Sequence, residues 1–384
     1  MSKILLGVTG CISAYKSASL IREFKKSGDQ VKVILTDNGA RFITPLTLRT
    51  LSENRVYTSL FDDENEWSTE HISLSRWADI LVVAPASANI IGKFASGIAD
   101  DLLSTTFLSF DKKILIVPTM NKSMYENKAT AENIKKLKER GIFVMEPEEG
   151  FLACGEEGKG RFPEIENIFL LTKRLLYPQE VLKGKKIIIT GGGTFEKIDP
   201  VRGLTNLSSG KMALSFAKAA YFNKAEKILF VHGRIDQKPY HFSENIKVES
   251  SEDMKKVLEE RIDEYDILVM AAAVTDFKPE YSENKIKKKN DLELKLHTTE
   301  DILKSFNDKK ILKIGFALES ESHIDNGLKK MKEKNLDYII VNDQNNLGKD
   351  KGTVTVVAKD GKFLKIEDLD KFEIALKVFE WIKF

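Results

Sequence analysis

The feature that most constrains this chain is a pattern of alternating strands and helices that occurs twice. In the first run, short β-branched segments alternate with longer amphipathic ones, which is typical of buried parallel strands and the helices that cover them. Strands are expected at 4–8, 31–36, 80–84, 114–118 and 142–145, and helices at 14–27, 88–94, 101–110, 130–140 and 165–176. After Gly184 the alternation begins again. The sequence therefore predicts an α/β protein with two doubly wound domains.

The second run begins with a strand at 186–190 and ends with a helix at 369–383. Between them, strands are expected at 227–231, 267–271, 311–316 and 337–341, and helices at 211–222, 252–262 and 323–334. Asp360-Gly361 is a turn signal between short strands at 354–357 and 363–366, which predicts a hairpin. Residues 146–164 are rich in Gly, Glu and Pro and are expected to form a long loop. Residues 177–184 are expected to link the two domains.

Charge and composition exclude several classes of protein. The 384 residues carry 60 Lys and Arg against 58 Asp and Glu, so the net charge is only +2, which argues against a nucleic-acid partner. No apolar run reaches the roughly 18 residues of a membrane helix, and the N-terminus leads into a strand rather than a signal peptide. With only Cys11 and Cys154, the chain has the cysteine content of a reduced protein. We expect a cytoplasmic protein without a membrane partner.

Small polar residues follow three predicted strands of the first domain. Thr9-Gly10-Cys11-Ile12-Ser13 separates the first strand from its helix, Thr36 ends the second strand, and Pro85-Ala86-Ser87-Ala88-Asn89 follows the third. Such turns offer backbone N–H groups and a helix N-terminus to a phosphate, at the sheet edge where α/β proteins bind ligands. Each segment could be an ordinary turn, but the three together favour a mononucleotide site.

Three other residues of the first domain could carry chemistry. His71 is expected just ahead of a strand, where it could equally be a solvent-facing loop residue. Asn121, in Pro118-Thr119-Met120-Asn121, could hold a carboxylate with its amide or form an Asx turn. Cys154 lies among glycines in the expected loop, which is unusual because a free cysteine is normally buried.

These segments resemble the FMN-dependent cysteine decarboxylase family, which includes the phosphopantothenoylcysteine decarboxylases of coenzyme A biosynthesis. The resemblance implies a flavodoxin-like flavoprotein fold over residues 1–178. It also implies a bound FMN that oxidises the cysteinyl thiol of the substrate, so that carbon dioxide can leave. His71 would serve oxidation and decarboxylation, Asn121 would bind the substrate carboxylate, and Cys154 would donate a proton during reduction. The FMN would be bound by Gly10, Ser13, Thr36, Ser87, Ala88 and Asn89.

Turns of the second domain also suit a nucleotide. Gly191-Gly192-Gly193-Thr194 follows a strand, and Asn206-Leu207-Ser208-Ser209-Gly210-Lys211 opens a helix. Both could bind phosphate, although a simply capped helix is the alternative for the second. After the strand that ends in Ala271-Ala272-Ala273, Asp276 could hold Mg²⁺. The basic run Lys285–Lys289 could neutralise a pyrophosphate or could be a solvated surface.

The second domain resembles the phosphopantothenate–cysteine ligases, which bacteria commonly fuse to the decarboxylase in this order. The resemblance implies a ribokinase/Rossmann-like ligase fold over residues 184–384 and the use of CTP and Mg²⁺. CTP would convert 4′-phosphopantothenate into an acyl-cytidylate, and cysteine would displace CMP to give 4′-phosphopantothenoylcysteine. Asn206 would hold the acyl-cytidylate, Arg202 would serve ligation, and Lys285 would serve the second half-reaction. The CTP site would consist of Ala271, Ala272, Ala273, Asp276, Phe316, Lys330 and Lys334, while the metal ligands stay open.

Some positions depart from the two families, and other functions stay open. Phe195 stands where the ligases commonly have a polar or basic residue, Thr119 where the decarboxylases have Ala, and Cys11 where they have Gly or Ser. Phe316 could belong to the core instead of stacking on a base. The alternatives are a decarboxylase of another cysteinyl substrate and a flavin-binding regulatory protein. The resemblances imply a homo-oligomer of decarboxylase trimers and ligase dimers, which a fusion could join into a dodecamer.

Overall fold

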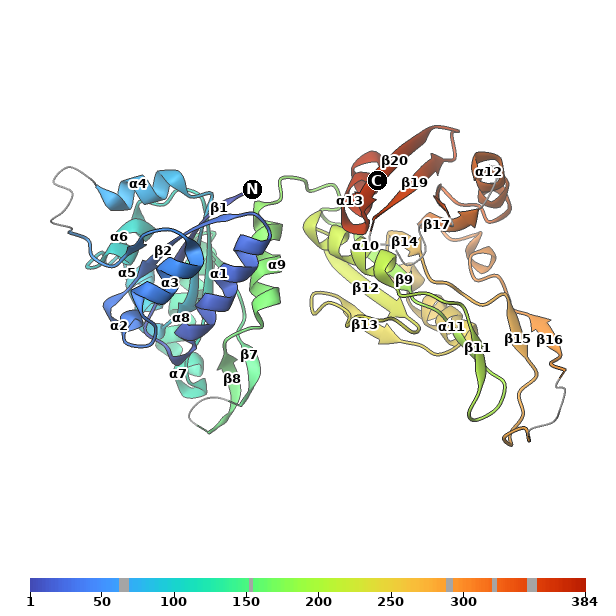
Figure 1. Ribbon diagram of the computed structural model, residues 1–384, viewed down its shortest axis with the longest axis horizontal. Coiled ribbons are helices and arrows are strands. Elements are labelled where there is room, and N and C mark those ends of the chain that lie inside the picture. The colour runs from blue at the N-terminus through green and yellow to red at the C-terminus, as the bar shows by residue number, and fades with distance from the viewer. Residues whose placement is uncertain (62–68, 152–154, 288–292, 320–322, 344–350) are drawn as a thin grey trace. The chain divides into compact units, whose positions relative to one another are not determined.

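The structure is a computed structural model that describes residues 1–61, 69–151, 155–287, 293–319, 323–343 and 351–384. The chain divides into two compact units, Met1–Tyr177 and Pro178–Phe384. The expected link at 177–184 begins where the two units separate. Each unit is a β-sheet with helices on both faces, as Figure 1 shows for each of them.

A six-stranded parallel sheet forms the centre of the first unit. Its strands follow the order β3-β2-β1-β4-β5-β6, with β1 at Lys3–Val8, β2 at Gln30–Leu35, β3 at Val56–Tyr57, β4 at Ile80–Ala86, β5 at Lys113–Pro118 and β6 at Phe143–Val144. This 3-2-1-4-5-6 order is that of the Rossmann folds, whereas flavodoxin has the order 2-1-3-4-5. The predicted doubly wound architecture is confirmed, and the order reverses between β1 and β4.

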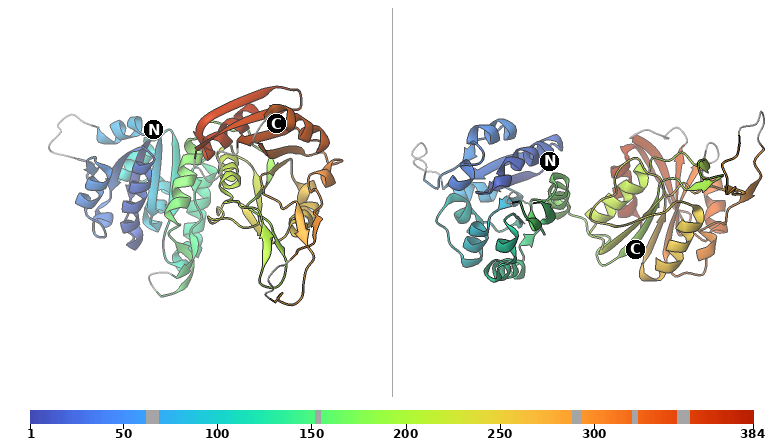
Figure 2. Two further views of the ribbon diagram at one scale, coloured as in Figure 1. Left: turned by 45° about the vertical axis from the view of Figure 1, so that its right-hand side comes forward. Right: turned by 90° about the horizontal axis from the view of Figure 1, so that it is seen from below.

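Alternating side chains of the strands pack into two separate cores. Ile4, Leu6 and Val8 face the layer formed by α1 (Lys16–Lys26), α3 (Pro45–Ser52) and α9 (Ile165–Leu176). Leu5 points to the opposite layer, which consists of α4 (Glu70–Trp77), α5 (Ala88–Ser96), α6 (Leu102–Leu108) and α8 (Lys128–Glu139). This alternation is the two-residue period of a strand that is buried on both faces. Helices on both sides of the sheet are visible in both views of Figure 2.

Two sequence-based expectations for the first unit are wrong. His71 lies in α4 rather than in a loop, because Glu70 and Leu74 on one side of this helix are buried. Residues 146–164 are not one loop, since β7 (Glu148–Phe151) and β8 (Glu157–Arg161) form an antiparallel hairpin. Gly160 explains the error, because a Cβ there would lie only 2.2 Å from the carbonyl oxygen of Met120. The glycines allow close backbone packing, and they do not mark an open loop.

An eight-stranded sheet forms the centre of the second unit. Its order is β13-β12-β9-β14-β17-β18-β19-β20, with β9 at Lys186–Gly191, β12 at Lys227–His232, β13 at Glu244–Lys247, β14 at Ile267–Met270, β17 at Leu312–Glu319, β18 at Tyr338–Asp343, β19 at Lys351–Ala358 and β20 at Phe363–Asp370. The first six strands are parallel and repeat the 3-2-1-4-5-6 order of the first unit. The predicted hairpin, β19–β20, extends the sheet with antiparallel strands.

Helices and short ribbons complete the second unit. α10 (Lys211–Phe222) and α13 (Lys371–Trp381) pack together through Phe216 and Phe379, whose ring centres are 5.3 Å apart. The opposite core includes Met254 and Leu258 of α11 (Ser251–Arg261) and Met331 of α12 (His323–Glu333). Two ribbons project from the sheet (Figure 1). One consists of β10 (Phe195–Lys197) and β11 (Gly203–Thr205), and the other of β15 (Phe277–Pro279) and β16 (Leu296–Thr298). The two ribbons contact each other through β10 and β15. Among the described residues, no helix is long and apolar enough to cross a membrane.

A buried ion pair ties the start of β2 to α9. Both carboxylate oxygens of Asp29 lie 2.9 Å from Lys173 Nζ, and the Asp29 side chain has no exposed surface. Because removing one partner of a buried pair leaves the other charge uncompensated, Asp29→Ala should lower the free energy of unfolding by about 2 to 3 kcal/mol in urea titrations. Lys25→Met breaks an exposed pair and should cost less than about 1 kcal/mol. Equal losses for the two variants would show that the burial of Asp29 is unimportant.

Candidate functional site

The hydroxyl of Thr9 joins the two strands at which the first sheet reverses. It donates to the carbonyl oxygen of Pro85 at 2.9 Å and accepts from the N–H of Ser87 at 3.0 Å. The next residue, Gly10, leaves no room for a side chain, because a Cβ would lie 2.5 Å from Cβ of Asn38. A narrow turn therefore occupies the edge of the sheet where Rossmann-type folds bind their ligands.

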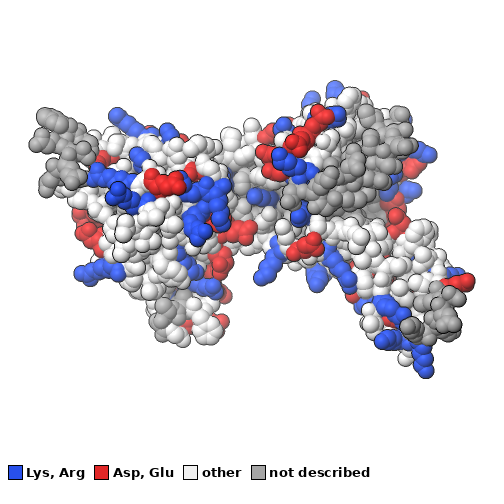
Figure 3. All heavy atoms as spheres, viewed as in Figure 1, with Lys and Arg blue, Asp and Glu red and all other residues white. Residues whose placement is uncertain are grey.

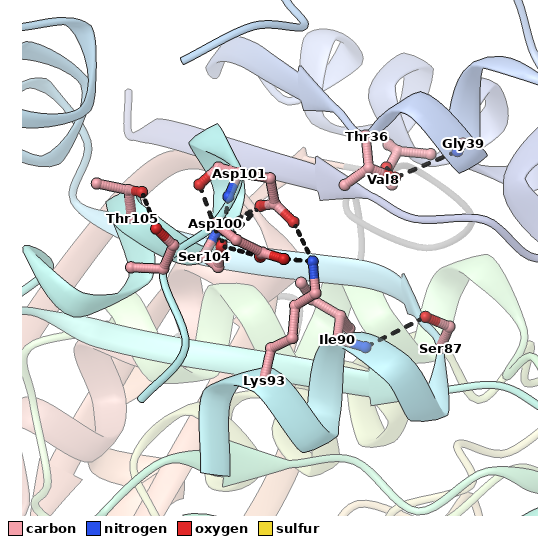
Figure 4. Close-up of polar contacts among 11 residues, drawn as sticks. Val8, Thr36, Gly39, Ser87, Ile90, Lys93, Asp100, Asp101, Ser104 and Thr105 are labelled. Carbon is pink, nitrogen blue, oxygen red and sulfur yellow. Dashed lines mark hydrogen bonds and ion pairs between the residues drawn. The ribbon is translucent and has the colours of Figure 1, made fainter. Parts of the chain in front are cut away.

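The predicted flavin-binding hydroxyls lie at this edge and are largely used to build it. Thr36 Oγ1 accepts from the N–H of Gly39 at 3.2 Å, and Ser87 Oγ accepts from the N–H of Ile90 at 3.4 Å (Figure 4). These bonds cap the short helix α2 (Asp37–Ala40) and α5. Ser13 is nearly buried, and its hydroxyl lies 3.3 Å from Cys11 Sγ. The hydroxyls of Thr36, Ser87 and Ser13 are thus engaged in local hydrogen bonds of this edge.

Sequence reasoning missed a charged network between α5 and α6. Lys93 Nζ lies 2.6 Å from Asp100 Oδ1 and 2.8 Å from Asp101 Oδ2, as Figure 4 shows. Asp101 also accepts from the N–H of Ser104 at 2.8 Å and so caps α6. Burial by itself raises the pKa of Asp101, but the hydrogen bonds from Lys93 and Ser104 lower it overall. The Asp-x-x-Ser spacing of a capping box was the available sequence signal.

Asn121 and the β7–β8 hairpin meet at the carboxyl end of β5. Asn121 Nδ2 donates to Glu156 Oε2 at 2.9 Å, and its Oδ1 accepts from the N–H of Met124 at 3.3 Å, which caps α7 (Lys122–Glu126). The N–H of Met120 donates to the carbonyl oxygen of Gly160 in β8. Cys154 lies outside the described residues, between β7 and β8. The amide expected to bind a substrate carboxylate therefore already holds a carboxylate beside the segment that contains Cys154.

His71 lies in the first turn of α4. Its carbonyl oxygen accepts from Ser75 Oγ at 2.7 Å, and its side chain is partly exposed. Within the described part of this unit, no hydrogen bond joins His71 to Asn121. The structure therefore places Asn121 beside the hairpin and His71 in the first turn of α4.

Glu146 connects the hairpin to the neighbouring helices. Its carboxylate lies 2.8 Å from each of Lys138 Nζ, Lys159 Nζ and the hydroxyl of Tyr125. Lys138 belongs to α8, Tyr125 to α7 and Lys159 to β8. Hydrogen bonds from Lys138 and Lys159 lower the pKa of Glu146 to about 2, against the effect of burial.

The lowered pKa of Glu146 predicts a pH-dependent contribution to stability. A carboxyl whose pKa is lower in the folded state stabilises that state above its unfolded pKa, and the effect disappears as the pH falls through the folded pKa. Because Glu146 is 53% exposed, Glu146→Gln should lower the free energy of unfolding by less than about 1 kcal/mol at neutral pH. The difference from wild type should shrink to zero between about pH 4.5 and pH 2. In denaturant titrations, a difference independent of pH would contradict this assignment.

In the second unit, the glycine-rich turn after β9 is enclosed by backbone on both sides. Gly192 has a φ of +74°, and a Cβ there would lie 2.3 Å from the carbonyl oxygen of Arg234. A Cβ on Gly193 would lie 2.4 Å from the carbonyl oxygen of Asn206. The N–H of Ala273 donates to the carbonyl oxygen of Gly192 at 2.8 Å. Only glycine permits this packing, which brings the segments after β12, β11 and β14 together.

Asn206 lies at the same edge as the predicted Ala271–Ala273 segment. Its Nδ2 donates to the carbonyl oxygen of Val274 at 2.9 Å. Below it, the buried hydroxyls of Thr194 and Thr275 are 3.1 Å apart, and Thr275 Oγ1 donates to Glu196 Oε1 at 3.0 Å. The Asn206 side chain therefore bonds the residue next to this buried polar group, and it remains exposed.

A buried carboxylate anchors the loop that carries Lys285. Asp199 Oδ2 accepts from Arg202 Nη2 at 2.6 Å and from the N–H of Ile286 at 3.1 Å. Arg202 Nη2 also donates to the carbonyl oxygen of Ile286 at 2.6 Å. Burial by itself raises the pKa of Asp199, but backbone N–H groups of Val201 and Ile286 lower it to about 2. Arg202 and Lys285, which the sequence predicted separately, are therefore held in one assembly.

The remaining predicted nucleotide residues lie along the next segments. The N–H of Thr299 donates to the carbonyl oxygen of Asp276 at 2.9 Å, and Asp301 forms an ion pair with Lys334 at 3.0 Å. Lys330 is exposed on α12. The ring of Phe316 is 5.4 Å from that of Phe216, which supports a role in the core.

The described side chains provide carboxylates but no complete metal cage. Asp276 is exposed beside the predicted nucleotide segments. Within the described ranges, no group of three or more His, Cys, Asp or Glu residues is close enough to hold a metal ion. This donor set fits Mg²⁺ that arrives with phosphates, because protein sites for Mg²⁺ often supply one or two carboxylates.

Comparison with known proteins accounts for both units. The family described as Flavoprotein matches residues 1–176, and the family described as DNA/pantothenate metabolism flavoprotein C-terminal domain matches residues 182–384. The coenzyme A biosynthesis bifunctional protein CoaBC of Bacillus subtilis is 39% identical over 99% of this chain and 96% of its own length. CoaBC of Borreliella burgdorferi is 37% identical over 98% of both chains.

A relative with a different name also matches most of the chain. A cysteine/cysteine sulfinic acid decarboxylase from an unidentified prokaryote is 38% identical over 88% of this chain and 98% of its own length. The matches to both CoaBC proteins span the two units nearly completely, and the two family models together match residues 1–176 and 182–384. The chain belongs to the CoaBC family of bifunctional coenzyme A biosynthesis enzymes, which combine decarboxylase and ligase activities.

Proposed function

We propose that residues 184–384 ligate 4′-phosphopantothenate to cysteine with CTP, and that residues 1–178 decarboxylate the resulting 4′-phosphopantothenoylcysteine to 4′-phosphopantetheine with FMN. The proposal is supported by one feature that both units share. In each, the residues expected to bind phosphate lie where the 3-2-1-4-5-6 strand order reverses. The reactions would take place in the cytoplasm.

In the decarboxylase unit, FMN supplies the electron transfer that oxidises and later reduces the substrate. The turn at Gly10 would hold its phosphate through backbone N–H groups, because a side chain at this position does not fit. Asn121 would bind the substrate carboxylate in place of the Glu156 carboxylate that it holds in the structure. Cys154 would donate a proton to the substrate.

His71 requires a second copy of the chain in this proposal. A homo-oligomer built on trimers would place His71 of one copy near Asn121 of another. Dimers of the ligase unit would join such trimers into a dodecamer.

In the ligase unit, the chain's own residues would mainly bind and orient. The turn at Gly191–Thr194 and the start of α10 would hold phosphates through N–H groups. Asn206 would hold the acyl-cytidylate, and Lys285 would act in the attack by cysteine. Asp276 would contribute a carboxylate to Mg²⁺, and Lys330 and Lys334 would complete the CTP site with Ala271, Ala272 and Ala273, while Phe316 packs against Phe216.

A matched pair of glycine variants tests the flavin site. Gly10→Ala places a Cβ 2.5 Å from Asn38, whereas Gly92→Ala on α5 meets nothing closer than 3.8 Å. We expect purified wild type and Gly92→Ala to release FMN on denaturation, and Gly10→Ala to release little. Normal FMN content in folded Gly10→Ala would contradict the proposed flavin site.

A nucleotide assay tests the ligase site. With 4′-phosphopantothenate present, wild type should release pyrophosphate from CTP, and EDTA should stop the reaction. Pyrophosphate release that persists in EDTA would contradict the role proposed for Mg²⁺ at Asp276.

A further inference from the structure

The segment Gly233–Asp236 lies between the two turns of the second unit that are predicted to bind phosphate. The N–H of Gly233 donates to the carbonyl oxygen of Gly191 at 3.0 Å, and the N–H of Asp236 donates to the carbonyl oxygen of Ser209 at 3.2 Å. Between them, Arg234 exchanges two backbone hydrogen bonds with Gly193, at 2.9 and 3.1 Å. The segment is therefore fixed against the Gly191–Thr194 turn on one side and the start of α10 on the other.

In the described part of the chain, the side chain of Arg234 is oriented by an aromatic ring and not by a carboxylate. Its guanidinium carbon lies 3.7 Å from the centre of the Phe195 ring. Within the part of the chain that the structure describes, no carboxylate forms an ion pair with Arg234, and its side chain is exposed. A guanidinium stacked by its face keeps its N–H edge available, and that edge matches the oxygens of a phosphate.

Phe195 is itself held in place. Its N–H donates to the carbonyl oxygen of Glu249 at 2.8 Å, and β10 pairs with β11. A planar ring on a fixed strand restricts the long Arg234 side chain, which would otherwise lose more conformational entropy on binding. The unusual aromatic residue after the glycine-rich turn therefore has a physical role.

We propose that Arg234 is a binding residue for a phosphate group of a ligase substrate, either the triphosphate of the nucleotide or the 4′-phosphate of phosphopantothenate, and that Phe195 is a positioning residue for Arg234. The proposal deepens the proposed ligase function and rests on it. The glycine and serine turns contribute only backbone dipoles and hydroxyls, so Arg234 adds a full positive charge to the site.

Steady-state kinetics of the full-length enzyme test this assignment. Arg234→Gln should raise KM about tenfold for the substrate whose phosphate it binds. KM for cysteine and the rate of decarboxylation of added 4′-phosphopantothenoylcysteine should stay unchanged. Lys256→Gln on α11 removes another exposed positive charge and should change no KM. A rise confined to CTP would assign Arg234 to the nucleotide, and a rise confined to 4′-phosphopantothenate would assign it to that phosphate.

A relocation variant separates charge from structure. In the double variant Phe195→Arg with Arg234→Ala, a guanidinium from position 195 can reach the space that the Arg234 guanidinium occupies in wild type. Arg234→Ala alone should raise the KM for the phosphate substrate, and the double variant should return it largely to the wild-type value. Phe195→Leu should raise the same KM as Arg234→Gln, by a smaller factor. Unchanged KM values for both phosphate substrates in folded Arg234→Gln would overturn the proposal. If wild type itself formed no ligation product with CTP, the proposed ligase function would fail instead.

Discussion

Replacing His71 by Asn is expected to abolish decarboxylation and to leave ligation at its wild-type rate. Asn resembles His in size and polarity but cannot take up and release a proton near neutral pH, and loss of a general acid–base group typically costs about a hundredfold to ten-thousandfold in rate. His71 lies in α4 of the first unit, whereas all the predicted ligase residues lie in the second. The variant, given 4′-phosphopantothenate, cysteine and CTP, should therefore accumulate 4′-phosphopantothenoylcysteine.

The flavin content and a second histidine serve as controls for this variant. His71→Asn should retain the FMN content of wild type, because the turn at Gly10 is unchanged. His241→Asn in the second unit should leave decarboxylation unchanged. If ligation fell together with decarboxylation in a folded His71→Asn variant, the two sites would not be independent.

Replacing Lys285 by Gln is expected to stop ligation after the first half-reaction. Pyrophosphate should still form, because CTP and 4′-phosphopantothenate react before cysteine enters, but CMP release should fall by at least about a hundredfold. Asp199 and Arg202 hold the backbone of the adjacent residue Ile286, so the position of the loop should survive the substitution. Mass spectrometry should detect the acyl-cytidylate in the variant.

The neighbouring Lys287 provides a matched control for Lys285. Both side chains are exposed, and basic side chains gather along the β15–β16 arm in Figure 3. Lys287→Gln should reduce ligation by less than about threefold, as expected for a solvated charge. Equal losses in the two variants would favour a general electrostatic effect of the basic run over a specific role of Lys285.

The sequence predicted the central strands of both sheets, because strands buried on both faces leave a continuous apolar signal. It did not predict the edge strands β3 and β13 or the helices α3 and α4. The short helices α2 and α7 escaped prediction because side-chain caps at Thr36 and Asn121 define them, rather than hydrophobic periodicity. The β7–β8 hairpin also escaped, since Gly160 packs against Met120 and Gly158 against Lys122, and glycines carry no strand signal.

Individual site residues were easier to predict than their partners. Gly10 and Asn121 follow predicted strands, as expected, but nothing in the sequence linked Arg202 to Ile286 or Phe195 to Arg234. Such pairs join segments far apart in the chain, and their contacts depend on the tertiary fold. For His71, the sequence predicted neither α4 nor the hydrogen bond from Ser75 to the His71 carbonyl oxygen.

The measurement that tests the central claim most directly is a mass-spectrometric product assay with the full chain. Purified protein is incubated with 4′-phosphopantothenate, cysteine and Mg²⁺, once with CTP and once without it. The account predicts 4′-phosphopantetheine only in the reaction that contains CTP. It would be contradicted by cysteamine formed from cysteine without CTP, the outcome expected of a free-cysteine decarboxylase, or by the absence of any product from folded, flavin-loaded protein.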